Sequence, residues 1–283
     1  MIKNEKLSKI KTLLSNADYI LIGAGAGLST AAGNTYTGER FEKNFKPFIE
    51  KYHFKDLYTS GFYDFKTEEE KWAYWSKHIY IANTSLPELP LYKKIFIYLE
   101  NSKKDYFIIT TNVDDWLYKV GFDPNKIFRP QGSYKILQCK YACHDGLYDY
   151  TKQVEEMVKN IDEKTCTIQS KYVPKCPKCE GKMFCNIRAD EYFVEGDVYH
   201  NGKKKYEEFL KKIQGKRVVL LELGVGFNTP VIIRFPFEKM TAQNDNFHLV
   251  RLNMNELECV FDLGDKVSLI PGDMKKSLEL ILS

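Results

Sequence analysis

Cysteines are the residues of this chain best suited to chemistry, and six of the seven lie between positions 139 and 185. Two close pairs stand out, one C-x3-C and one C-x2-C: Cys139 with Cys143, and Cys176 with Cys179. Two such pairs provide the four thiolates of a structural Zn²⁺ site, which leaves no open coordination position for catalysis. The C-x3-C spacing is the less usual one, so His144 or Cys185 could substitute as a ligand. The alternative is a set of free or buried thiols.

A glycine-rich turn follows the first apolar run of the chain. The run at 19–22 leads into Gly23-Ala24-Gly25-Ala26-Gly27. Glycine lets a backbone approach a pyrophosphate closely, and a following helix offers free N–H groups to it. The strict G-x-G-x-x-G spacing is not met, because Leu28 occupies its final position. Nucleotide binding and a tight turn without a ligand therefore both fit this motif taken alone.

The elements that must position these residues alternate between short apolar strands and helical segments. We expect strands at 19–22, 106–110, 218–223, 247–252 and 267–270. We expect helices near 3–16, between about 42 and 100 with breaks near Pro87 and Pro90, and at 274–282. Such an alternation is typical of a parallel sheet covered on both faces. The predicted class is α/β, with a Rossmann-like parallel sheet, helices on both faces and a small inserted zinc-ribbon module.

The stretch 134–200 interrupts this alternation, since it holds six cysteines and few long apolar runs. The expected division is therefore 1–133 with 201–283 as the Rossmann-like domain, and 134–200 as the zinc-binding module. The net charge is +4 with no dense Lys/Arg stripe, which argues against a nucleic-acid partner. No apolar stretch reaches the ~20 residues that cross a bilayer, and the N-terminus lacks a signal-peptide pattern. We expect a cytoplasmic protein with no membrane partner.

Six segments resemble motifs of the sirtuin family, in the same order and over nearly the whole chain. The segment 23–33 resembles the GAG-x-S loop, 110–114 the TQNID motif and 224–230 the GTS loop. Asn253 resembles the asparagine that ends a strand in the family, and the four paired cysteines occupy the proper place. Gln131, followed by Gly132, stands where the family has a histidine followed by glycine.

The resemblance implies that NAD⁺ binds between a Rossmann-like NAD-binding domain and a zinc-bearing domain, and that its nicotinamide–ribose bond is broken. Asn112 would position the ribose and the attacking group, and Asp114 would bind the nicotinamide carboxamide. Arg40 would match the arginine of the G-I-P-D-F-R segment, although 33–40 is longer and lacks the Pro-Asp-Phe core. The implied catalytic residues are Asn112, Asp114 and Gln131. The implied cofactor-binding residues are Gly23, Ala24, Gly25, Ser29, Arg40, Asn112, Asp114, Gln131, Gly224, Val225, Gly226 and Asn253.

Gln131 is the departure that bears on the reaction. In deacetylating sirtuins the histidine acts as general base on a ribose hydroxyl, whereas an amide cannot take that proton near pH 7. Losing a positioned base costs ~10²–10⁴ in rate. Nicotinamide departure does not need the base, so cleavage should survive while deacetylation largely does not.

Gln131, the altered loop after Gly33 and the chain length are similar to those of the class M sirtuins, microbial proteins linked to macrodomains. This resemblance implies protein mono-ADP-ribosylation of a lipoylated relative of the glycine-cleavage H carrier, with a macrodomain hydrolase as a further partner. A protein deacylase, a non-catalytic NAD⁺ sensor and an NAD⁺ glycohydrolase are the alternative functions.

Several of these residues also have ordinary structural interpretations. Asp114 and Asp115 could cap the following helix, and Asn112 could be a turn residue. His248 lies within an apolar strand, which is typical of a core histidine. A base could instead come from a histidine elsewhere, such as His144 or His200; His53 and His78 have no neighbours in sequence that suggest a role.

Overall fold

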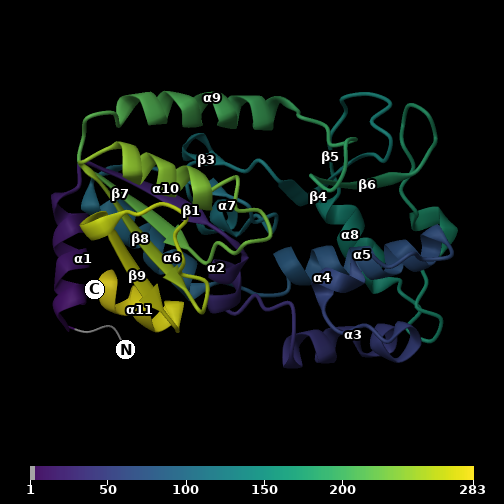
Figure 1. The fold of residues 1–283 in the computed structure, drawn as a ribbon. Coiled ribbons are helices and arrows are strands. Elements are labelled where there is room, and N and C mark those ends of the chain that lie inside the picture. Colours follow the sequence, from purple (N-terminus) through teal and green to yellow (C-terminus); the bar gives the residue numbers. More distant parts are fainter. Residues whose placement is uncertain (1–3) are drawn as a thin grey trace.

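The apolar strands expected from the sequence form one parallel sheet. The computed structural model describes residues 4–283 and orders the sheet β3-β2-β1-β7-β8-β9 (Figure 1). All five predicted strands are confirmed, and a two-residue edge strand, β3, adds to them. The strands of this sheet are β1 (Tyr19–Ala24), β2 (Asp105–Thr110), β3 (Ile127–Phe128), β7 (Val218–Leu223), β8 (Phe247–Asn253) and β9 (Val267–Pro271).

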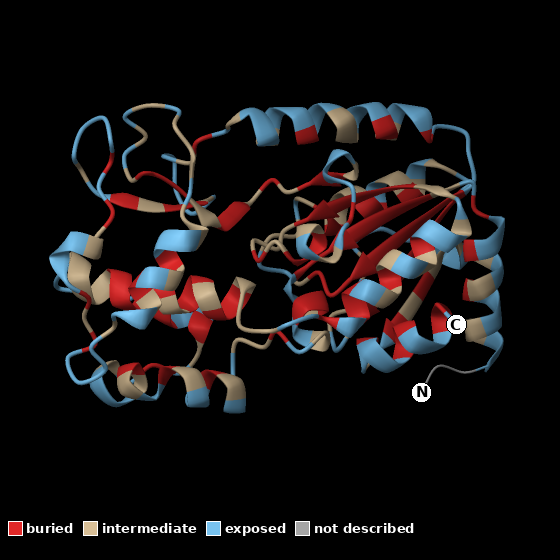
Figure 2. Cartoon of the chain, turned by 180° about the vertical axis from the view of Figure 1, so that it is seen from behind, coloured by how far each residue is buried: buried red, intermediate tan, exposed pale blue. Residues whose placement is uncertain are grey.

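Side chains alternate between the two faces of this sheet, and each face has its own core. Ile20 and Ile22 of β1 pack on one face, while Leu21 packs on the other. The first face is covered by α1 (Asn4–Asn16), α2 (Ala26–Ala31), α6 (Pro90–Ser102), α7 (Trp116–Val120) and α11 (Met274–Ile281). The second face is covered by α9 (Asp197–Lys212) and α10 (Arg234–Gln243). The strands are buried between two helical layers, which explains why most of their residues are apolar (Figure 2).

Local signals in the sequence set the ends of the helices. Thr67 accepts a hydrogen bond from the Glu70 N–H at the start of α5 (Glu68–Asn83), and α6 begins at Pro90. In α3 (Glu39–Tyr52) the backbone leaves helical geometry at Phe45, two residues before Pro47, which has no N–H to donate to the preceding turn. The predicted helix near 3–16 is found as α1, and residue 3 lies outside the described residues.

A second lobe is built around a small antiparallel sheet and an aromatic core (Figure 1). Its core joins side chains of two segments far apart in the sequence, 41–82 and 134–185. The helices α3–α5 thus pack with the cysteine-bearing segment and not with the parallel sheet. The proposed boundaries at 134 and 200 stay a prediction. The elements of this lobe are α3 (Glu39–Tyr52), α4 (Leu57–Ser60), α5 (Glu68–Asn83), β4 (Gly132–Cys139), β5 (Tyr148–Asp149), α8 (Thr151–Lys159) and β6 (Met183–Ile187).

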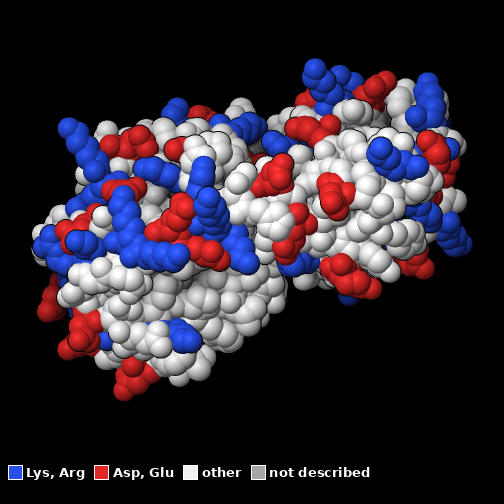
Figure 3. All heavy atoms as spheres, turned by 90° about the horizontal axis from the view of Figure 1, so that it is seen from above, with Lys and Arg blue, Asp and Glu red and all other residues white. Residues whose placement is uncertain are grey.

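The face of the molecule that α9 crosses carries charges of both signs. Lys and Arg are interspersed with Asp and Glu on the face that α9 crosses (Figure 3). Within residues 4–283, none of the helices combines the length and apolar character that spanning a bilayer requires.

Candidate active site

The strand order predicts where a ligand can bind. From β1 the chain builds β2 and β3 outward on one side, and β7, β8 and β9 outward on the other. The order therefore reverses between β1 and β7, and in parallel α/β sheets ligands bind outside the carboxyl ends of strands at such a point. The two glycine turns, at 25–27 and 224–226, follow β1 and β7 at this position.

The two glycine turns contact each other directly. The Gly25 N–H donates to the Leu223 carbonyl over 2.9 Å, and the Gly27 N–H donates to the Gly224 carbonyl over 3.0 Å. A Cβ on Gly224 would lie 2.5 Å from the backbone of Gly27, and the φ of Gly224 is +63°. Glycine is required at these positions for backbone contact and for a left-handed conformation. The two turns therefore form a rigid floor, meaning a closely packed backbone surface, at the point where the strand order reverses.

A network of polar side chains stands beside this floor. The Asn112 amide donates to the Gly25 carbonyl over 3.0 Å and lies 3.2 Å from the Ser29 hydroxyl. The Ser29 hydroxyl donates to the Asp114 carboxylate over 2.6 Å. Tyr92 completes the network, since its hydroxyl lies 2.9 Å from that of Ser29 and 3.3 Å from the Asn112 amide. Four of the residues predicted from sequence are thus joined by hydrogen bonds.

Asp114 is a carboxylate held almost out of water. It is 5% exposed, and burial raises its pKa from 3.8 to about 6, against the opposing effect of the Ser29 hydrogen bond. The Asn34 amide donates to it over 3.3 Å and also to the Ala82 carbonyl over 3.0 Å. A desolvated carboxylate in a polar network is a strong acceptor for a ligand amide. Asp114 contributes little to capping the following helix, because the helix N–H that it contacts, that of Trp116, lies 3.5 Å away.

The segment that contains Gln131 lies next to the turn that contains Asn112. The Tyr134 N–H donates to the Val113 carbonyl over 3.0 Å, which joins the start of β4 to this turn. The Gln131 carbonyl accepts from the Arg188 N–H over 3.1 Å. Gln131 is half-buried, and its side-chain amide makes no hydrogen bond to any residue in 4–283. Its amide group is therefore available to a ligand.

The loops after β7 and β8 form a second part of the site. The Asn253 amide donates to the Val225 carbonyl over 3.0 Å, so the predicted strand-end asparagine contacts the second glycine turn. The Glu256 carboxylate accepts from the Phe227 N–H over 3.2 Å and borders Gly226.

Three predicted cofactor residues have other partners in the structure. Arg40 donates to the carbonyls of Thr35, over 2.9 Å, and Ile81, over 2.5 Å, and no hydrogen bond joins it to the Asn112 network in residues 4–283. A Cβ on Gly23 would lie 2.4 Å from Ile233, so this glycine is needed for packing under α10. The Ala24 carbonyl accepts the Thr110 hydroxyl and the Thr111 N–H between β1 and β2. Their cofactor roles stay predictions.

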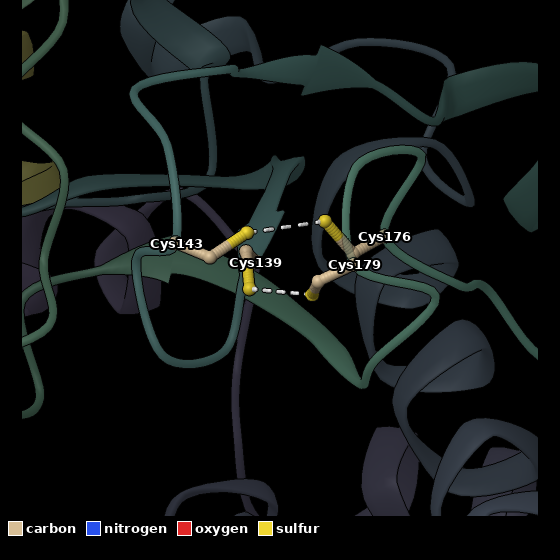
Figure 4. Close-up of side chains that lie close together, drawn as sticks. All are labelled: Cys139, Cys143, Cys176 and Cys179. Atoms are coloured by element: carbon tan, nitrogen blue, oxygen red, sulfur yellow. Dashed lines mark hydrogen bonds between the residues drawn. The ribbon is translucent and has the colours of Figure 1, made fainter.

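The four paired cysteines form one cluster, although they come from two separate segments, the end of β4 with the loop after it and the loop before β6 (Figure 4). Their sulfur atoms all lie within 4.8 Å of one another. The Cys139–Cys179 and Cys143–Cys176 distances are 3.8 and 3.6 Å. Zn–S bonds of ≈ 2.3 Å in a tetrahedron separate the sulfurs by about 3.8 Å, so the cluster fits a metal ion. Cys185 does not belong to this cluster. The His144 ring lies beside the cluster, 3.1 Å from the Cys143 sulfur.

Sequence reasoning missed Tyr92, which belongs to no motif, and Asn34, which lies in the poorly matching segment 33–40; both reach the site only through tertiary packing. The structure places two of the histidines, His248 and His78, in buried positions. His248 is 8% exposed and contacts the Ser268 hydroxyl over 3.0 Å, which confirms it as a core residue. His78 is buried among aromatic rings, and burial lowers its pKa to about 3, so it is neutral.

Comparisons with known proteins place these features in a family, although no family model matches the chain. A Staphylococcus aureus (strain Mu50) relative described as a protein ADP-ribosyltransferase is 34% identical over 252 residues, covering 89% of this chain and 79% of the relative. A Fusarium oxysporum f. sp. cubense relative is described as a probable bifunctional ADP-ribose hydrolase/ADP-ribosyltransferase. It is 32% identical over 287 residues, covering 98% of this chain and 47% of the relative. The chain thus spans about half of the second relative.

Solved structures show the same fold. Sir2Tm bound to a propionylated peptide matches with a TM-score of 0.58 and 19% identity, over 98% of this chain and 97% of that one. A complex of a Sir2 homologue with NAD matches with a TM-score of 0.56 and 16% identity, over 98% and 95%. With the shared fold and the extensive identity to the bacterial transferase, the chain belongs to the sirtuin family of NAD-dependent enzymes.

Proposed function

We propose that the protein is an NAD⁺-dependent protein mono-ADP-ribosyltransferase. The nicotinamide–ribose bond breaks, nicotinamide leaves with the bonding electron pair, and a nucleophile of an acceptor protein bonds to the ribose carbon and releases a proton. The observation that carries this proposal is an intact polar network of Ser29, Asn112 and Asp114 beside a segment that has Gln131 in place of a base. The names of both relatives, each described as an ADP-ribosyltransferase, support it.

Asp114, Asn112 and Gln131 each have a proposed role in the reaction. The Asp114 carboxylate accepts the N–H groups of the nicotinamide carboxamide, which holds the leaving group in a dry environment. Asn112 holds the nicotinamide ribose, and its orientation is fixed by its bond to the Gly25 carbonyl. The Gln131 amide hydrogen-bonds a ribose hydroxyl without removing its proton, so the oxocarbenium-like centre is left for an external nucleophile.

The remaining cofactor contacts follow the two glycine turns. We propose that Ser29, Gly224 and Gly226 face the pyrophosphate and that Asn253 contacts the adenosine ribose. Gly23, Ala24, Val225 and Arg40 would complete the pocket through backbone shape and, for Arg40, through the loop 33–40. The four cysteines would hold Zn²⁺ as a structural ion, since a set of four thiolates leaves no position open to substrate.

The acceptor that we propose is a lipoylated carrier related to the glycine-cleavage H protein, with a macrodomain hydrolase as a further partner. The longer fungal relative supports the second point, because it is described as combining a hydrolase with a transferase. A cytoplasmic location fits the seven cysteines, none of which forms a disulfide within residues 4–283.

The test is to incubate the purified chain with NAD⁺ and with lipoylated or unlipoylated carrier. Nicotinamide release and mass gain on each protein are measured together. Asn112→Ala should abolish both signals, and Asn101→Ala, an exposed asparagine on α6, should change neither. Acyl-ADP-ribose formed from an acylated peptide would instead show a deacylase. Bound NAD⁺ that never yields nicotinamide would show a sensor, and nicotinamide release without mass gain would show a glycohydrolase.

A further inference from the structure

Asp115 lies at the start of α7 but does not cap this helix. It occupies the N-cap of α7, yet its side chain caps no helix N–H, and its φ is +54°. An aspartate at an N-cap normally has an extended backbone and accepts an N–H of the first turn, which stabilises a helix by ~1 kcal/mol. The left-handed conformation is itself unfavourable for a residue with a Cβ. The start of α7 therefore lacks this stabilising cap, and the carboxylate makes its hydrogen bonds elsewhere.

The carboxylate is bound instead by two residues of the neighbouring segment. One oxygen accepts from the Arg129 guanidinium, and the other accepts from the Ser133 hydroxyl. The Asp115 side chain is 6% exposed and that of Arg129 is 15% exposed, so water competes little for this pair. Lys135 approaches the same carboxylate only at 3.9 Å and is more exposed. Arg129 is also fixed by Tyr118, whose ring lies 4.9 Å from the guanidinium carbon.

Arg129 and Ser133, the two partners of Asp115, lie on either side of Gln131 in the sequence. Gln131 is the middle residue of 129–133, and both ends of this five-residue segment bind the one carboxylate. Next to Gln131, Gly132 has a φ of +85° and lies against the backbone of Asn186 in β6, so this turn requires a glycine. Asp115 itself belongs to the turn that contains Asn112.

We propose that Asp115, Arg129 and Ser133 form a bracket that positions Gln131 relative to Asn112. The proposal rests on the proposed function, since it deepens the role of Gln131. These are positioning residues: they act through Gln131 and do not touch the ribose. Misplacement of a catalytic group by about 1 Å can cost 10²-fold in rate, so opening the bracket lowers turnover while the NAD⁺ site itself stays intact.

The first experiment measures the nicotinamide-release rate of the full chain with its acceptor. Asp115→Asn keeps the shape and the Ser133 contact but removes the ion pair, and kcat should fall about 10- to 100-fold, with KM for NAD⁺ within about 3-fold. Arg129→Lys should retain more activity than Arg129→Met, because it keeps the charge. Asp123→Asn is the matched control, since Asp123 is exposed and caps only a short turn. Wild-type turnover in Asp115→Asn would overturn the bracket.

A double-mutant comparison separates positioning from general damage. In a Gln131→Ala background, Asp115→Asn should cause no further loss, because there is no amide left to position. An equal loss in both backgrounds would refute the bracket.

A readout without catalysis keeps this test independent of the proposed function. Hydrogen exchange at the amides of residues 131–134 should be faster in Asp115→Asn and unchanged in Asp123→Asn. Unchanged exchange in Asp115→Asn would overturn the bracket even in a chain that proves inactive towards NAD⁺. If the chain proves inactive towards NAD⁺ but exchange is faster in Asp115→Asn, the proposed function is refuted and the bracket is supported.

Discussion

Asp114→Asn should stabilise the protein at neutral pH while abolishing its activity. Burial raises the pKa of this carboxyl from 3.8 to about 6, so the folded protein prefers the protonated form. Its favourable contribution is fully present below pH 3.8 and is lost as the pH rises through 6. At pH 7.5 the ionised carboxylate therefore costs the fold about 3 kcal/mol, because each pH unit that separates the unfolded and folded pKa values is worth about 1.36 kcal/mol.

Asparagine has the same shape without the charge, and its oxygen can still accept from Ser29. The variant should gain about 3 kcal/mol at pH 7.5, a rise of roughly 6 °C in Tm for a chain of this size. At pH 4 most of this gain should disappear, because wild-type Asp114 is then protonated when folded. Denaturant unfolding at pH 7.5, 6, 5 and 4 measures this difference between the two proteins.

The comparison of two proteins at each pH cancels the other titrating groups. Asp123→Asn, at an exposed carboxylate, should show no such pH-dependent gain. A loss of stability in Asp114→Asn that is the same at every pH would refute the reasoning, since it would mean that burial does not raise the pKa of this carboxyl in the folded protein. Nicotinamide release should be lost in either case if Asp114 holds the carboxamide.

Three further results are expected. If the four cysteines hold Zn²⁺ as proposed, Cys176→Ser should lower the zinc content per chain and the Tm of the second lobe; a zinc content equal to that of the wild type would exclude this ligand set. Gln131→His should yield acyl-ADP-ribose from an acylated peptide above the wild-type level, because an imidazole can accept the ribose proton; no gain would show that more than this residue blocks deacylation. Gly224→Ala should be strongly destabilising, since the new Cβ would lie 2.5 Å from Gly27 at a φ of +63°; Gly215→Ala, with a φ of +70° and nothing within 4 Å, isolates the backbone effect.

The sheet could be predicted because its strands are continuous apolar runs buried on both faces, and that pattern is local. The cysteine cluster could be predicted for a similar reason, since pair spacing alone defines a knuckle. The edge strand β3 could not, because two residues carry no periodicity. The resemblance supplied Asn112, Ser29 and Asp114, which the structure joins by hydrogen bonds.

Other parts of the site depend on contacts that no local pattern encodes. Tyr92 has the sequence context of an ordinary core aromatic of α6, and only the packing of α6 beside α2 brings its hydroxyl to Ser29. The position of Asp115 favours a helix cap, an interpretation that the structure contradicts because Arg129 and Ser133 take its carboxylate. The loop 33–40 lacks the family core, and its Arg40 side chain binds backbone carbonyls.

The aromatic core that joins 41–82 to 134–185 constrains how this protein can be dissected. A fragment cut at 134–200 would leave Trp72, Tyr74 and Phe45 without the surface that now covers them, and the excised piece would expose the matching apolar side. Chimeras between relatives should therefore exchange both segments together. The two lengths of chain would also be expected to change in concert during evolution, since a substitution on one side of this shared core alters the space available to the other.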